Sequence, residues 1–167
     1  MNRSNYVEDQ GDLWAVVRWR GAVKSAIRGA RGQQFLFDLI AGLDALPEKK
    51  LIGNQLEVEG EFCALGVVAH RRGIDIKEYE FPENQYDIDD CHHERIANAL
   101  DIADALGREA MFVNDDSWYY SNIPERAARQ RYQRVYDWAA ANIKKRECES
   151  CGKKFTPRTA DQVLCEF

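Results

Sequence analysis

Residues 124–147 read PERAARQRYQRVYDWAAANIKKRE, and apolar side chains return every three or four positions within this stretch. That spacing places them on one face of an α-helix. Pro124 suits the first helical turn, where its missing N–H is not needed. We therefore predict the longest helix of the chain here, followed by a C-terminal tail that begins at Glu147. The inward face of this helix comprises Tyr132, Val135, Trp138, Ala139 and Ile143.

Four stretches upstream repeat the helical period. They run from Asp12 to Gly29 or Gly32, from about Phe35 to Pro47, from Glu61 to Arg72 with Gly73 as a stop signal, and from Asp90 to Gly107. Leu56 and Val58 alternate with charged residues, which allows one brief strand. We expect a mainly α protein: a compact domain of about five helices at residues 1–146, with at most a short β element, and a small tail at 147–167.

Composition excludes several classes of protein. With 167 residues, 45% of them hydrophobic, the chain can form the core of one domain and is not generally disordered. No apolar run approaches the roughly 20 residues of a membrane helix, and residues 1–6 lack the apolar stretch of a signal peptide. The five cysteines, an odd number, indicate a cytoplasmic protein that binds metal rather than one that forms disulfides.

Charge is distributed unevenly, although the net charge is only −5. Residues 75–116 hold 3 basic and 13 acidic side chains, whereas residues 124–158 hold 10 basic and 4 acidic ones. The acidic stretch is interpreted as a solvated loop, or as a surface that meets a basic partner. Its candidate contact residues are Glu78, Glu80, Glu83, Asp87, Asp89 and Asp90.

The tail carries the strongest chemical signal. Cys148 and Cys151 form a C-x-x-C pair followed by glycine, two lysines and an aromatic residue, and Cys165 follows after thirteen intervening residues. Two thiolates at this spacing can hold one Zn²⁺, and the pattern resembles the first knuckle of a zinc ribbon or treble clef. We therefore expect these three cysteines to hold a structural zinc ion. The alternative is three reduced cysteines on a frayed end.

The fourth zinc ligand is the missing part of this pattern, because a second knuckle places it shortly after Cys165 and the sequence ends at Phe167. Cys91, His92 and His93 are the candidates to supply it if the tail folds back. Otherwise they form a polar helix entry with exposed histidines. Water, or a second chain in a homodimer that shares one zinc, would also complete the site.

Two groups of basic residues are candidates for contact with phosphates or with a protein partner. One recurs at helical spacing near the N-terminus, and the other surrounds the C-x-x-C pair. Such stripes also keep helices soluble and pair with acidic loops. The residues are Arg20, Lys24, Arg28, Arg31, Lys144, Lys145, Arg146, Lys153 and Lys154.

No constellation of residues points to catalysis. Cys63 and His70 share a helix face, but two turns separate them by roughly 10 Å, too far to share a proton. Cys63 is interpreted as a small buried hydrophobe. The carboxylate pair in Asn114-Asp115-Asp116-Ser117 would suit a metal or acid–base chemistry, but short polar residues more commonly cap and turn the backbone, and that interpretation is preferred. The sequence contains no phosphate loop, dinucleotide fingerprint, zinc-protease helix or serine elbow. We do not expect an enzyme, although one of unrecognised type stays open.

Four short motifs occur in the helical region: Trp19-Arg20-Gly21-Ala22-Val23, Ala26-Ile27-Arg28-Gly29, Leu43-Asp44-Ala45-Leu46-Pro47 and Cys63-Ala64-Leu65-Gly66. They resemble motifs of small uncharacterised proteins of phages and prophages. The last one, followed by Asn114-Asp115 and a closing amphipathic helix, is also similar to a bacterial domain family of unknown function. This resemblance covers about residues 12–145. It implies a phage-type accessory protein in the cytoplasm of a bacterial host, and it implies no catalytic residues.

Two functions follow as hypotheses. The first is a non-enzymatic protein-binding factor that inhibits a bacterial host or defence protein, with the acidic stretch presenting a nucleic-acid-like surface. The alternative is a zinc-containing nucleic-acid-binding module that uses the basic helix faces and the tail. Neither hypothesis involves a membrane.

Overall fold

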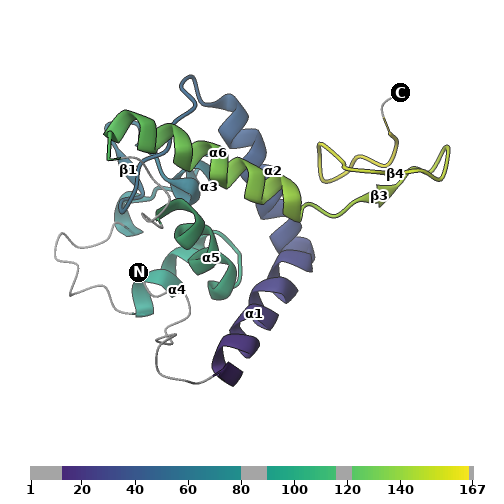
Figure 1. The fold of residues 1–167 in the computed structure, drawn as a ribbon, viewed down its shortest axis with the longest axis horizontal. Helices are drawn as coiled ribbons and strands as arrows, with labels where there is room; N and C mark the ends of the chain where they lie inside the picture. The colour runs from purple at the N-terminus through teal and green to yellow at the C-terminus, as the bar shows by residue number, and fades with distance from the viewer. Residues whose placement is uncertain (1–12, 80–89, 116–121, 166–167) are drawn as a thin grey trace.

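Helices account for most of the structure, as the apolar spacing predicts. The computed structural model describes residues 13–79, 90–115 and 122–165. Within these ranges the fold is mainly α, with six α-helices (Figure 1). They are α1 (Leu13–Arg28), α2 (Ala30–Ala45), α3 (Ala64–Arg72), α4 (Asp90–Ala99), α5 (Asp104–Asp115) and α6 (Pro124–Asn142), with a 3₁₀ turn, η2 (Lys77–Tyr79). Across this described part of the chain, no helix combines the length and the apolar character that crossing a membrane requires.

Two short antiparallel hairpins complete the described structure. In the helical region, β1 (Glu57–Val58) pairs with β2 (Glu61–Phe62) across a two-residue turn. Both turn residues, Glu59 and Gly60, have positive φ angles of 52° and 83°, as in the type I′ turn that suits a tight hairpin. In the tail, β3 (Arg146–Glu147) pairs with β4 (Lys154–Phe155). The sequence pattern therefore located the first hairpin but recognised only one of its strands.

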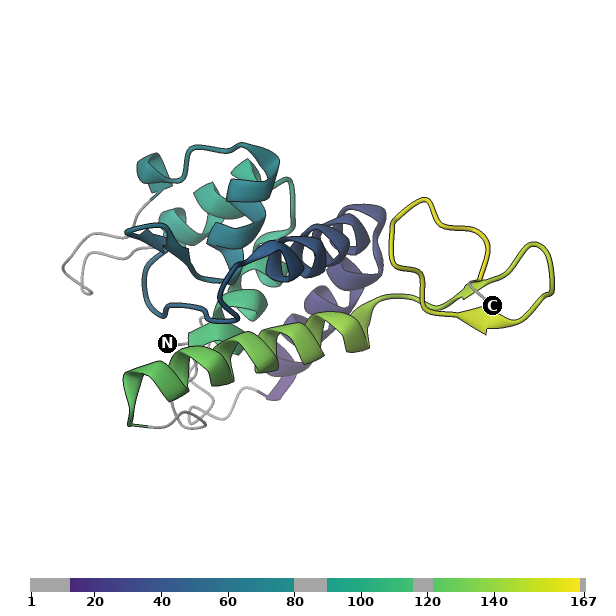
Figure 2. The ribbon, with the colours of Figure 1, turned by 90° about the horizontal axis from the view of Figure 1, so that it is seen from above.

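The core forms around α2 and α5. Helix α2 packs against α1, α3 and α6, and α5 packs against α1, α3, α4 and α6. The inward face predicted for α6 is buried at Tyr132, Val135, Ala139 and Ile143, whereas Trp138 is only half-buried. Seen from above, α6 runs along one side of the domain and leads directly into the tail, which projects past the end of the helices (Figure 2).

The third predicted helix begins later than Glu61, because residues 61–62 pair with β1 instead. Cys63 is the N-cap of α3, and its Sγ accepts a hydrogen bond from the Gly66 backbone N–H at 3.5 Å. Gly66 is packed so closely that a Cβ atom there would lie 2.1 Å from the Leu56 carbonyl oxygen. The predicted stop at Gly73 is confirmed, since this residue caps α3 with φ 68°.

The single helix predicted from Asp90 to Gly107 is wrong, because the chain forms two helices there. Helix α4 ends at Ala99, and Asp101 follows in the left-handed conformation with φ 48°. The Ile102 N–H then bonds the Ala97 carbonyl at 2.9 Å and the Asp101 N–H bonds the Asn98 carbonyl at 3.0 Å. This is the Schellman pattern, which ends a helix and usually uses glycine. An aspartate in that position leaves little signal in the sequence.

Candidate metal centre and basic groove

The tail hairpin places Cys148 and Cys151 at its turn. Strand pairing of Arg146 with Phe155 and of Glu147 with Lys154 brings the chain back on itself immediately around the C-x-x-C pair. The Cys148 N–H donates to the Lys153 carbonyl at 2.9 Å, and the Gly152 N–H donates to the Cys148 carbonyl at 2.8 Å. Gly152 has φ 69°, a conformation that glycine adopts without strain. The local sequence therefore forms the knuckle expected of a metal-binding hairpin.

Cys165 completes a cluster of three thiols. The Glu149 N–H donates to the Val163 carbonyl at 3.1 Å, which holds the end of the described chain beside the knuckle. The Sγ atoms of Cys148, Cys151 and Cys165 all lie within 4.8 Å of one another, and those of Cys151 and Cys165 are 3.5 Å apart. Tetrahedral zinc–sulfur bonds of about 2.3 Å require sulfurs about 3.8 Å apart. The three cysteines are therefore close enough to bind one metal ion, as predicted.

The environment of the cluster favours a thiolate at Cys148. The Cys165 backbone N–H donates to Cys148 Sγ at 3.3 Å, and this bond, together with the Cys165 thiol, lowers the pKa of Cys148 to about 6. The same contact with Cys148, and a second with Cys151, raises the pKa of Cys165 to about 11. A bound cation would favour the thiolate at all three positions, because a coordinating thiol loses its proton.

The tail is also attached to the helical domain. Arg146 is half-buried, and its guanidinium donates to the carbonyls of Ala160 and Gln162, which shapes the segment between the hairpin and Cys165. Pro157 in that segment is buried, and Ala160 packs against the core. Arg146 was a candidate phosphate contact, but the structure gives its guanidinium a structural role within the tail.

The fourth-ligand candidates lie elsewhere. Cys91, His92 and His93 are in α4, and Figures 1 and 2 both place that helix across the domain from the tail. Among the described residues, no other His, Cys, Asp or Glu joins the three cysteines. The tail therefore does not fold back onto α4 in the described residues, which is the arrangement that these candidates would need.

A groove between α1 and the end of α6 is the second candidate site, with a cavity volume of about 550 Å³. Three of the predicted basic residues, Arg20, Lys24 and Arg28, line it from α1, and Lys144 lines it from the segment after α6. Among the described residues that line the groove, Glu109 of α5 is the one carboxylate. Lys144 of the second basic group therefore shares one groove with three residues of the first group, more than a hundred positions earlier in the sequence.

Gln33 fixes the end of this groove. Its Nε2 donates to the Ile27 carbonyl at 2.8 Å and to the Asn142 carbonyl at 3.1 Å, and its Oε1 accepts from the Lys144 N–H at 2.8 Å. The Lys144 ammonium also donates to the Arg28 carbonyl. These bonds join the turn after α1 to the end of α6, so the walls of the groove are held in place without a ligand.

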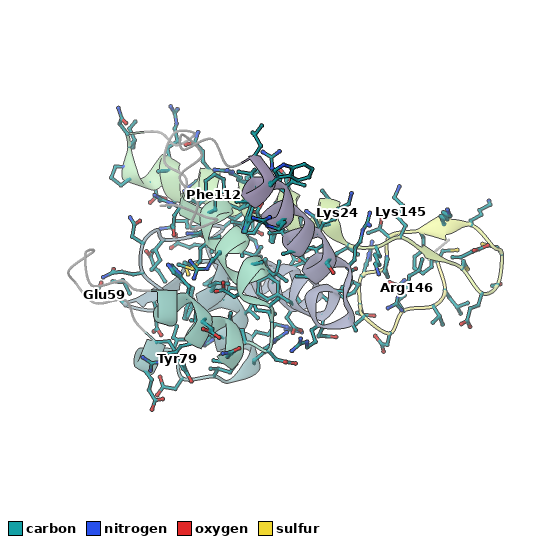
Figure 3. All side chains as sticks on the ribbon, turned by 90° about the horizontal axis from the view of Figure 1, so that it is seen from below. Lys24, Glu59, Tyr79, Phe112, Lys145 and Arg146 are labelled. Carbon is teal, nitrogen blue, oxygen red and sulfur yellow. The ribbon has the colours of Figure 1, made fainter. Side chains whose placement is uncertain are left out.

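The other predicted basic residues divide between two surroundings. Lys145 is exposed between the groove and the tail, and Figure 3 shows it on the same face of the molecule as Lys24. Lys153 and Lys154 are exposed on the tail hairpin. Arg31, in contrast, pairs with Asp101 at 2.9 Å and does not line the groove. The exposed cations of the groove and Lys145 therefore form one candidate surface, and Lys153 and Lys154 lie farther along the tail.

Most of the predicted acidic surface lies outside the described residues. This applies to Glu80, Glu83, Asp87 and Asp89, while Glu78 is exposed in η2 and Asp90 begins α4. The hypothesis that this surface binds a basic protein partner stays a prediction.

Cys63 and Asn114 have structural roles. Cys63 is 5% exposed, and burial raises the pKa of its thiol to about 12, which disfavours the thiolate that a nucleophile needs. Asn114 was interpreted as a turn-forming residue, but it is buried near the end of α5. Its Oδ1 accepts from the Ala64 N–H at 3.1 Å, and its Nδ2 donates to the Ile52 carbonyl at 2.8 Å. The Cys-Ala-Leu-Gly and Asn-Asp motifs therefore meet in space, where they join the start of α3 to α5.

Comparisons of this chain with protein-family models, with curated proteins and with solved structures give no match. Function is therefore inferred from the cysteine cluster and the basic groove themselves.

Proposed function

We propose that this protein is a zinc-stabilised nucleic-acid-binding module. The observation that carries the proposal is the groove in which Arg20, Lys24, Arg28 and Lys144 gather against a single lining carboxylate among the described residues. Phosphate groups are the ligands that such a cluster of guanidinium and ammonium groups attracts most strongly. The net charge of −5 does not oppose this function, because acidic residues are concentrated in a different part of the sequence.

Zinc is the metal that best suits the cysteine cluster. Thiolates are soft ligands, and sets of three or four of them at knuckle spacing are typical of zinc sites. The tail has little hydrophobic core of its own, so a metal ion would hold its hairpin and the segment ending at Cys165 together. No acid or base lies in the described cluster, so the role we propose for zinc is structural.

The tail closely follows a groove residue in the sequence, which supports a role for both the tail and the groove in nucleic-acid binding. Lys144 lines the groove, Lys145 follows it, and Cys148, three residues after Lys145, begins the metal knuckle. A folded knuckle would fix the positions of Lys153 and Lys154 relative to the helical domain, whereas an unfolded tail would leave them without fixed positions. Zinc binding is therefore proposed to strengthen nucleic-acid binding through the position of these lysines.

Native mass spectrometry tests the metal site. We expect one zinc per chain, and none after Cys148→Ser, with Cys63→Ser as the control that keeps the zinc because Cys63 lies in α3. The same spectrum reports subunit number. One zinc shared by a dimer would identify the second chain as the source of the missing ligand, and the absence of zinc from every preparation would overturn the metal site.

Titration with labelled single-stranded and duplex DNA at two salt concentrations tests the binding function. Replacing Arg20 and Lys24 by glutamine removes two contacts, so we expect the salt slope for a single strand to fall by about 1.4, at about 0.7 per phosphate contact. Arg126→Gln with Arg129→Gln is the matched control, since it removes the same charge from exposed positions near the start of α6, away from the groove.

Equal weakening by both double variants would show that binding follows overall charge and would contradict a site in the groove. If no nucleic acid binds at low salt, the function is wrong, and affinity capture of a basic bacterial protein would then favour the alternative hypothesis of a protein-binding inhibitor. A phage-type origin and a cytoplasmic location likewise stay predictions.

A further inference from the structure

The groove is not only basic; it also has an aromatic wall. Trp138 of α6 lines it together with Ala141, opposite the α1 residues Val23 and Ile27. Trp138 is half-buried, although its place in the helical period predicts a fully inward side chain. Its indole therefore stays partly available on the groove side. A site that combines apolar walls with a few charged groups is typical of pockets for a small, mostly flat ligand group.

We propose that the groove holds one unstacked base of a single-stranded nucleic acid against the Trp138 indole, while Arg20, Lys24 and Arg28 hold the adjoining phosphates. The proposal rests on the nucleic-acid-binding function and names the form of nucleic acid that the site takes. Aromatic side chains bind single strands by stacking on bases, and they do so with little dependence on sequence because every base has a π face.

Charge within the groove assigns the two parts of the nucleotide to opposite walls. Three of the exposed cations come from α1, Lys144 follows α6, and the carboxylate of Glu109 lies on α5. Three cations of the groove lie on α1 and a phosphate next to Glu109 would be repelled, so we place the phosphates along α1 and the uncharged base against Trp138.

Stacking on Trp138 requires a base that is not paired and stacked in a duplex. A cavity of about 550 Å³ is in the range of small-ligand pockets and can accept one nucleotide. Bases in a duplex are stacked and paired, and an enzyme or binding protein reaches their faces only after unpairing them at a cost. Single strands expose those faces without that cost, so the aromatic wall adds affinity for single strands alone.

Binding of three probes separates base stacking from phosphate binding. The probes are a thymidine 12-mer, an abasic 12-mer with the same backbone charge, and a duplex of equal length, each measured by fluorescence anisotropy with the metal-loaded full chain. We expect the thymidine strand to bind at least about 5-fold more tightly than the abasic strand. We also expect Trp138→Ala to reduce binding of the thymidine strand to the abasic level, and Trp138→Phe to retain part of the difference.

Trp14→Ala is the matched control. Trp14 lies on α1, is 73% exposed and does not line the groove. Its replacement should therefore leave the affinities for all three probes unchanged. Circular dichroism checks that each variant folds. A second measurement needs no variant: irradiating the native protein with a 5-bromouracil strand should crosslink a tryptic peptide that contains Trp138.

The outcomes distinguish this proposal from the one on which it rests. Equal affinity for thymidine and abasic strands, or a duplex that binds as tightly as the single strand, would overturn base stacking while leaving phosphate binding in place. A crosslink that maps to another tryptophan would also overturn it. Absence of binding to every probe at low salt would instead overturn the nucleic-acid-binding function itself.

Discussion

Replacing Asn114 by alanine should destabilise the protein far more than an ordinary helix substitution. Asn114 is 1% exposed, and its side chain bridges the Ala64 N–H, 3.1 Å away, and the Ile52 carbonyl, 2.8 Å away. The Ala64 N–H is buried, so leaving it without its acceptor costs about 1–3 kcal/mol. The contact with half-buried Ile52 adds about 1 kcal/mol. We therefore expect a loss of about 2–4 kcal/mol in the free energy of unfolding.

Urea unfolding followed by circular dichroism measures this loss. The midpoint should fall while the slope of free energy against urea stays constant, because the amount of surface exposed on unfolding is nearly the same. Asn98→Ala is the matched control, since Asn98 is an exposed asparagine in α4. If the two variants differ by less than about 0.5 kcal/mol, which is the usual range for surface substitutions, then Asn114 does not join α3 to α5 as described.

Three further predictions concern individual positions. Gly66→Ala should lower the free energy of unfolding by about 2 kcal/mol because its Cβ would lie 2.1 Å from the Leu56 carbonyl oxygen. Gly21→Ala should raise the free energy of unfolding by up to about 1 kcal/mol, because Gly21 lies in α1 and a Cβ atom there would meet nothing within 4 Å. Thermal melting compares the two variants. Burial raises the pKa of the Asp115 carboxyl above its ordinary 3.8, so the folded state binds the carboxyl proton more tightly than the unfolded state does. The free energy of unfolding therefore falls as pH rises through the shifted pKa. Asp115→Asn should flatten this fall in urea titrations from pH 4 to 7. Burial raises the pKa of Cys63 to about 12, so iodoacetamide at pH 8 should label it only after unfolding, as intact mass would report.

The sequence predicted structure correctly wherever the local conformation depends on residues of the same segment. The apolar period in residues 124–142 predicted α6 with Pro124 in its first turn, and glycine at position 73 predicted the end of α3. The spacing of Cys148 and Cys151 predicted the knuckle, because a two-residue gap and a following glycine fix the hairpin locally. In each case the residues that determine the geometry are neighbours in the chain.

Sequence reasoning was less accurate where a local signal was weak. The break at Asp101 was missed because a residue other than glycine occupies the left-handed position. The start of α3 was placed too early because Phe62 fits a helical face as well as it fits the short strand in which it lies. Two-residue strands leave almost no periodicity to detect.

What the sequence alone determined is therefore the helical class, most helix positions and the metal knuckle. Only the tertiary structure decided that Lys144 shares a groove with Arg28, that Gln33 joins the two ends of that groove, and that Asn114 links α3 to α5. These pairings join residues 50 to more than 100 positions apart, and a hydrogen bond over that distance depends on how the helices pack. Periodicity shows which face of a helix is buried, but it does not show which other element covers that face.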